Sequence, residues 1–172
     1  MLQLAANNGN IAASYELATR LETGDGLPQD VIGAWYLYAF GAQQGHVQSQ
    51  NSLGVMFHAG SAMDQDSSAA VYWFKKAAVK GDAAAQNNLG LMYLFGYGVD
   101  MDVQAALMWC GRSAAQGLAA GQYSLGWIHA SGHGVPTDHV LAETWLHFAE
   151  AGGDNRAPRM LDALAKIDLA AR

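Results

Sequence analysis

The stretch from residue 82 to residue 117, DAAAQNNLGLMYLFGYGVDMDVQAALMWCGRSAAQG, holds a pattern that recurs every 36 residues along this 172-residue chain. The pattern comprises a leucine–glycine pair, a second glycine, an aspartate, an alanine, a tryptophan and a terminal glycine. The terminal glycine, for example, stands at Gly9, Gly45, Gly81, Gly117 and Gly153. A fixed period of this length is typical of arrays in which each repeat is one supersecondary unit. The sequence therefore predicts four repeats, over residues 10–45, 46–81, 82–117 and 118–153.

Each position of the pattern has a physical meaning for a pair of helices. Leu89-Gly90 falls midway along a first helix, where glycine costs about 1 kcal/mol relative to alanine and is tolerated if a neighbouring helix comes very close. The turn from Gly96 to Val99 ends that helix, because glycine adopts the positive φ of a helix C-cap. An aspartate then caps the second helix. This aspartate recurs at Asp30, Asp66, Asp102 and Asp138.

The combined pattern resembles the Sel-one-like repeat family, a branch of the tetratricopeptide superfamily. The resemblance covers residues 10–153, and repeats three and four match best. It implies an all-α fold, a right-handed superhelix (solenoid) of antiparallel helix pairs. It also implies a role as an adaptor that binds a protein or peptide partner. Some bacterial members of the family are linked to penicillin binding or β-lactamase-like activity, so a β-lactam-binding or hydrolysing enzyme is the alternative.

The two ends of the chain depart from the full repeat. Residues 1–9 match the tail of a preceding second helix, and the chain begins inside a repeat. Residues 154–172 match a degenerate fifth first helix, with Leu161 at the leucine position and Asp162 where glycine is expected. This last segment is more charged than its counterparts, as suits a helix that caps a repeat array. We expect one repeat domain over residues 1–172.

Composition narrows the range of partners. The net charge of −6 and the pI near 5.3 argue against nucleic acid, whose phosphates an acidic surface repels. No apolar run approaches the roughly 20 residues of a membrane-spanning helix. Cys110 is the single cysteine, and no signal peptide is visible at the start of the sequence. These features favour a cytoplasmic monomer, with a fragment of a periplasmic protein as the alternative.

The resemblance also implies where a partner binds, because first helices line the concave face of this architecture. Residues two before and two after the leucine, and some one turn further on, are expected to face the groove. They are Tyr15, Thr19, Asn51, Val55, His58, Asn87, Leu91, Phe95, Tyr123 and Trp127. The set contains no lysine or arginine, unlike the two-lysine carboxylate clamp of some tetratricopeptide domains. Its aromatic and apolar members favour a peptide with apolar anchors.

Catalysis and metal binding find little support. No serine is followed three residues later by lysine, as a serine β-lactamase requires. Cys110 takes the position of Tyr38, Phe74 and Leu146 in the other repeats, which indicates a buried side chain. His129 and His133 have a spacing that suits zinc, but His133 lies in a glycine turn. We therefore expect no enzyme activity, no cofactor and no metal.

Overall fold

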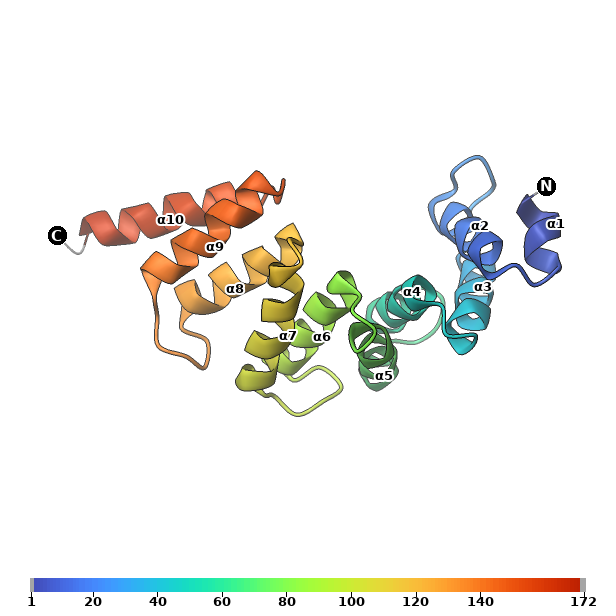
Figure 1. The fold of residues 1–172 in the computed structure, drawn as a ribbon, viewed down its shortest axis with the longest axis horizontal. Coiled ribbons are helices and arrows are strands. Elements are labelled where there is room, and N and C mark those ends of the chain that lie inside the picture. Colours follow the sequence, from blue (N-terminus) through green and yellow to red (C-terminus); the bar gives the residue numbers. More distant parts are fainter. Residues whose placement is uncertain (1, 171–172) are drawn as a thin grey trace. The chain divides into compact units, whose positions relative to one another are not determined.

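The computed structural model describes residues 2–170, and within that range it contains ten α-helices and no strand (Figure 1). The prediction of an all-α helical solenoid is confirmed. The chain forms two compact units, Met1–Asp82 and Ala83–Arg172. The helices are α1 (Leu2–Asn7), α2 (Ile11–Thr23), α3 (Val31–Gln43), α4 (Val47–Ala59), α5 (Ser67–Ala78), α6 (Ala83–Phe95), α7 (Val103–Ala115), α8 (Ala119–Ser131), α9 (His139–Ala151) and α10 (Ala157–Ala170).

Four helix pairs follow the 36-residue spacing. The first helices α2, α4, α6 and α8 begin 36 residues apart, and so do the second helices α3, α5, α7 and α9. Each first helix packs against its own second helix. In the second unit, α8 also packs against α6 and α10, so successive first helices lie side by side there. Helix pairs in sequence order have thus become neighbours in space within each unit.

Aspartate caps start all four second helices, as predicted. The carboxylate of Asp30, Asp66, Asp102 or Asp138 accepts a hydrogen bond from the backbone N–H three residues later, at 2.8–2.9 Å. Each bond satisfies one of the free N–H groups of the first helical turn. The glycine at the end of the first helix has the expected left-handed conformation, for example at Gly60, with φ +67° and ψ +32°. Sequence and local structure therefore agree at both ends of the turn.

The glycine of the leucine–glycine pair sits at the closest approach within each helix pair. A Cβ atom added to Gly90 would lie 2.5 Å from Sγ of Cys110 and 3.1 Å from the backbone oxygen of Ala106, both on α7. The same clash arises at Gly54 and Gly126 with the side chains of Phe74 and Leu146, respectively. The predicted close contact is confirmed, and it accounts for a glycine in the middle of a helix.

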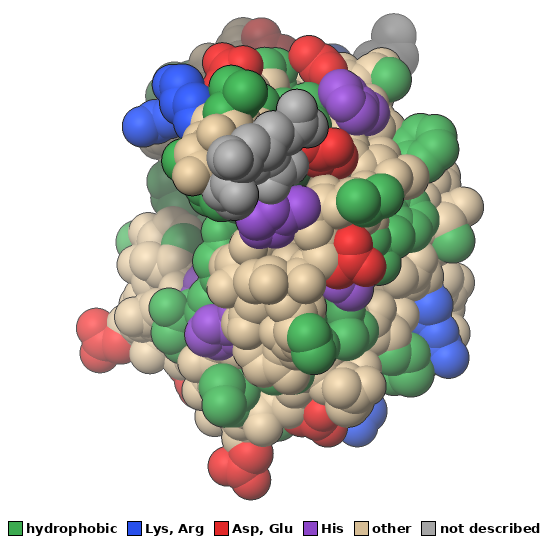
Figure 2. Space-filling view, turned by 90° about the vertical axis from the view of Figure 1, so that its left-hand side faces the viewer, with side chains coloured by type: hydrophobic (Ala, Val, Ile, Leu, Met, Phe, Trp, Pro, Cys, Tyr) green, Lys and Arg blue, Asp and Glu red, His purple; other side chains and the backbone are tan. Residues whose placement is uncertain are grey.

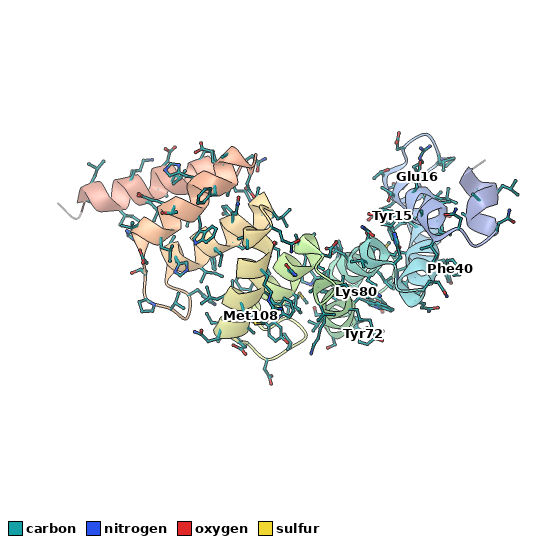
Figure 3. The ribbon with its side chains drawn as sticks, viewed as in Figure 1. Tyr15, Glu16, Phe40, Tyr72, Lys80 and Met108 are labelled. Carbon is teal, nitrogen blue, oxygen red and sulfur yellow. The ribbon has the colours of Figure 1, made fainter. Side chains whose placement is uncertain are left out.

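The cores are built from the repeated alanines and from the side chain facing each of these glycines. Ala34 and Tyr38 anchor a core in the first unit, and Ala106 and Cys110 anchor one in the second. Of the repeated tryptophans, Trp73 and Trp145 are half-buried and pack against these cores, and Trp109 is buried. Other large side chains of the second helices, including Phe40, Tyr72 and Met108, are exposed (Figure 3).

The close approach gives a test with a matched control. Replacing Gly90 with alanine is expected to lower the free energy of unfolding by about 1–3 kcal/mol, because the added Cβ overlaps the backbone and thiol of α7. This loss would outweigh the gain in helix propensity of about 1 kcal/mol. Urea denaturation measures the difference.

The control is Gly111→Ala, on α7 of the same unit. A Cβ added there meets nothing within 4 Å. This variant is expected to be more stable than the parent chain by about 0.5–1 kcal/mol, since only the propensity changes. Equal stability of the two variants would contradict the argument from close packing.

Candidate functional site

The predicted groove residues fall on four helices in two units. Those of the first unit lie on α2 and α4, and those of the second unit lie on α6 and α8. The two sets are described separately. Their side chains differ in what they contact, although they occupy equivalent positions of the repeat.

In the first unit, Tyr15 and Thr19 are half-buried and contact a buried tyrosine. The ring of Tyr15 packs against the rings of Tyr38 and His46, with centroids 5.6 Å and 5.2 Å away. Oγ1 of Thr19 lies 3.2 Å from the hydroxyl of Tyr38, which also donates a 2.8 Å hydrogen bond to Glu22. Burial raises the pKa of Tyr38 well above its ordinary value. Tyr15 and Thr19 therefore serve the packing of this unit.

The other predicted residues of the first unit lie on α4. Val55 is exposed, while Asn51 and His58 are half-buried. A hollow of about 300 Å³ in this unit lies elsewhere, on the second helix α3 and the turn after α4. Apolar and aromatic side chains line it: Ile32, Trp35, Tyr36, Ala62 and Met63.

In the second unit, four of the five predicted residues come together. Leu91 and Phe95 from α6 and Tyr123 and Trp127 from α8 line one hollow of about 320 Å³, with Ser124 and Arg156 completing its wall. Asn87 does not line this hollow. It is only 6% exposed, and its side-chain oxygen is buried without a hydrogen-bond partner among the described residues.

An aromatic cluster forms one side of this hollow. The rings of Phe95, Trp127 and His133 contact one another pairwise, with centroid distances of 5.7–5.9 Å. Tyr97 adds a fourth ring, 5.7 Å from Phe95. Packed rings hold each other in place, so the cluster presents a fixed apolar surface. Among residues 2–170 no group of three potential ligands could hold a metal ion, and His133 belongs to this cluster.

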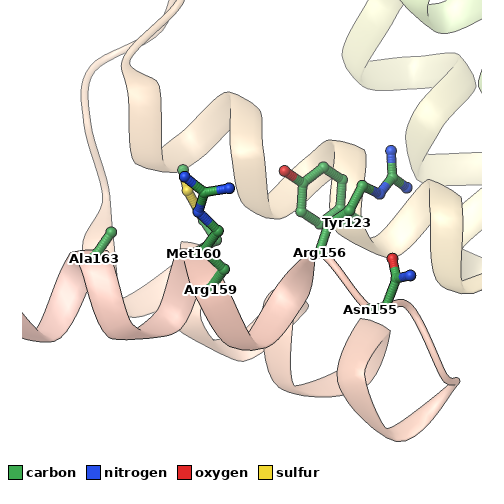
Figure 4. A pocket seen from close by; sticks show the side chains of 6 residues that line it. All are labelled: Tyr123, Asn155, Arg156, Arg159, Met160 and Ala163. Atoms are coloured by element: carbon green, nitrogen blue, oxygen red, sulfur yellow. The ribbon is translucent and has the colours of Figure 1, made fainter.

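A second hollow of about 480 Å³ adjoins the first, since Tyr123 and Arg156 line both. The hollow is completed by Asn155, from the turn before α10, and by three residues of α10: Arg159, Met160 and Ala163. In Figure 4 the side chains of Arg156, in the turn before α10, and Arg159, on α10, extend toward α8, and the ring of Tyr123 lies between them in that view. Two arginines thus lie beside the apolar hollow.

Neither arginine is among the predicted groove residues, yet the repeat spacing leads to one of them. Continuing the groove positions by 36 residues from Tyr123 and Trp127 gives Arg159 and Ala163, and both line the second hollow. The degenerate fifth copy was interpreted only as a polar cap. Its first helix therefore has the same orientation toward the groove as α8.

A local ion pair holds Arg156 in place. Its Nε and one Nη donate to the two carboxylate oxygens of Asp154, at 2.9 Å and 2.6 Å, and its backbone N–H donates to the same carboxylate. These hydrogen bonds hold the pKa of Asp154 below its usual value. The guanidinium also lies over the ring of Tyr123, 4.0 Å from its centroid. Arg156 therefore links α10 to α8.

Cys110, the single cysteine, lines neither of these hollows. Cys110 is fully buried against Gly90, and burial raises the pKa of its thiol to about 12, so it is not a nucleophile at neutral pH.

On the face shown in Figure 2, acidic and basic side chains are scattered among hydrophobic and uncharged ones. No helix in the described part of the chain is long and apolar enough to cross a membrane.

Comparison with known families identifies the architecture. A model described as the Sel1 repeat matches residues 11–46, 47–82, 83–118 and 119–154. The chain belongs to the Sel1 repeat family. The four matched segments begin one residue after those that the glycine spacing defines. The comparison with curated proteins gave no match.

Solved bacterial structures share this fold. A protective antigen of uropathogenic Escherichia coli strains with an SLR fold is 35% identical, with a TM-score of 0.82, over 91% of this chain and 33% of that one. A Sel1 repeat protein from Oxalobacter formigenes is 26% identical, with a TM-score of 0.90, over 97% of this chain and 66% of that one. The immunity protein Pa5087 from Pseudomonas aeruginosa, 23% identical with a TM-score of 0.65 over 91% of this chain and 58% of that one, shows the fold alone. This chain thus spans about a third of the first protein.

The Asp154–Arg156 pair predicts a pH-dependent contribution to stability. The pKa of Asp154 is lower in the folded state than in the unfolded chain, so its contribution is present at neutral pH and is lost as the pH falls below about 4. Asp154→Asn is expected to lower the free energy of unfolding by about 1 kcal/mol at pH 7. The deficit should shrink toward pH 3, as measured by urea denaturation. Asp162→Asn, at an exposed residue of α10, should show no such deficit.

Proposed function

We propose that this chain is a protein-binding scaffold, and that its second unit holds an apolar segment of a partner in the hollow formed by Leu91, Phe95, Tyr123 and Trp127. The observation that carries this proposal is the meeting of four large apolar and aromatic side chains at one open hollow. Two of them, Phe95 and Trp127, are held by neighbouring rings. Preorganised aromatic side chains lose little entropy on binding and are common in interface hot spots.

The position of the hollow in the repeat supports a peptide-like occupant. The hollow follows the first helices α6 and α8, which pack side by side. A strip that runs across successive helices can accept consecutive side chains of one bound segment. Catalysis needs an activated group beside the substrate. The lining supplies the hydroxyls of Tyr123 and Ser124, and that of Ser124 donates to the backbone oxygen of Ala120. Binding therefore fits this surface better than a reaction does.

The equivalent face of the first unit is a further proposed contact surface, formed by Tyr15, Thr19, Asn51, Val55 and His58. Val55 is the exposed apolar member of this set. Since Tyr15 and Thr19 also pack against Tyr38, we expect the first unit to contribute less binding energy than the second.

A pair of phenylalanine variants tests the proposal. Phe95 lies in the hollow on a first helix and is 41% exposed, while Phe148 lies on the second helix α9 and is 55% exposed. Phe95→Ala is expected to weaken partner binding about tenfold or more, as loss of an interface anchor does. Phe148→Ala is the matched control and should bind as the parent chain does. The measurement is affinity capture from a bacterial lysate, quantified by mass spectrometry and followed by titration of the captured protein.

Comparison of binding by the parent chain and the two variants shows whether the partner binds at this hollow or at another surface. Capture of the same proteins by all three chains, at equal strength, would place the binding surface elsewhere or show that the chain binds none of them specifically. Circular dichroism and urea denaturation confirm that each variant is folded. Trp127→Ala, at the other side of the same aromatic cluster, should reproduce the loss seen with Phe95→Ala.

A further inference from the structure

The second hollow adds positive charge to the proposed binding surface. The whole chain has a net charge of −6 and nine basic residues. Two of these, Arg156 and Arg159, line one hollow together with Tyr123. No carboxylate is among the residues that line this hollow. Asp154 pairs with Arg156 from outside the lining, so the two arginines and this aspartate sum to +1. A basic site therefore adjoins the apolar hollow in an otherwise acidic protein.

Arg156 is oriented by the fold but retains hydrogen-bond donors. A guanidinium has five N–H groups, and the pair with Asp154 uses two of them, one on Nε and one on Nη. The side chain is 53% exposed, whereas that of Asp154 is 6% exposed. The remaining donors on the outer edge are thus available to a second acceptor, and the guanidinium need not reorganise to meet it.

Arg159 is exposed on α10, and no hydrogen bond or ion pair joins it to another residue whose side chain the structure describes. It occupies the groove position that Tyr123 occupies one repeat earlier. Asp162, one turn further along α10, is not among the residues that line the hollow. The whole guanidinium group of Arg159 is therefore available to a bound ligand. It lies at the end of the row of groove positions that runs across α6, α8 and α10.

We infer that the partner segment carries acidic side chains, aspartate or glutamate, next to the apolar residue that enters the first hollow. This inference rests on the proposed function and adds the chemistry of the partner. The two arginines are one helical turn apart, which suits two carboxylates on one segment. Guanidinium groups pair with carboxylates through two parallel hydrogen bonds. Apolar anchoring in one hollow and ion pairing in the next give the bound segment a defined direction.

Electrostatics exclude other anionic partners from this assignment. A nucleic acid or an anionic membrane presents many phosphates, and its binding requires an extended basic surface. The basic site here comprises two arginines, and the net charge of −6 repels a polyanion. A short acidic stretch of a partner protein instead contacts only the two arginines, and the net charge of the whole chain matters less for its binding.

Charge reversal tests the inference on the full chain. A randomised peptide library displayed on phage is selected against the parent chain, against Arg159→Glu and against the control Lys166→Glu, which carries the same charge change on α10 outside the hollow. Arg159 is changed rather than Arg156 because Arg156 also holds α10 to α8. The parent chain and Lys166→Glu should select peptides that combine aspartate or glutamate with an aromatic or large aliphatic residue. Fluorescence polarisation should show at least about tenfold weaker binding of these peptides to Arg159→Glu.

Arg159→Glu should instead select peptides with lysine or arginine beside the apolar residue. Peptides that need Phe95 but show no charge preference, and bind Arg159→Glu as well as the parent chain, would overturn the acidic-partner inference while supporting the apolar hollow. Peptides that bind Phe95→Ala as well as the parent chain would count against the proposed function itself. If Lys166→Glu weakened peptide binding equally, the effect would come from the net charge of the chain alone. That result would also overturn the inference.

Discussion

The distance between the two helices of each repeat is the constraint on which the other features depend. Gly54, Gly90 and Gly126 allow a first helix to lie directly against the side chain at the middle of its second helix. Ala18 takes this role in the first repeat, fully buried in the same core as Tyr38. Because cores are close-packed, a methyl group added at Gly54, Gly90 or Gly126 would overlap the side chain that faces it. The constraint fixes the rotation of each first helix, and hence which of its residues turn toward the groove.

The fold could be predicted from the sequence because each local requirement, such as a helix cap or a turn, recurs in several repeats. The aspartate caps, the glycine turns and the leucine–glycine contacts each rest on a separate physical cause, and all share one period. The candidate site was less predictable. Asn87 occupies the same position as Tyr123, yet it is buried whereas Tyr123 lines two hollows. The period gives the direction of a side chain, but its exposure depends on the size of its neighbours, which vary between repeats.

Differences among the repeats, rather than their shared residues, make the site. The residues that the repeats share form the helix caps, the turns and the cores. At the groove positions the first repeat has Tyr15 and Thr19, which pack around Tyr38 and Glu22. The fourth repeat has Tyr123 and Trp127, and the corresponding core side chain is Leu146, which has no hydroxyl to engage them. Their rings are therefore left to line the hollows.

The start of α10 shows how the end of the repeat array contributes to the site. In the first unit, the ring of Tyr15 packs on His46, the residue that caps the next first helix. One hundred and eight residues later, the equivalent cap position is Asp154, and a carboxylate cannot stack on Tyr123 in that way. Arg156 supplies the missing surface, because it neutralises Asp154 and covers the ring of Tyr123. The junction that is aromatic at His46 is thereby cationic at residues 154–156. Positive charge thus lies where the row of groove residues reaches α10.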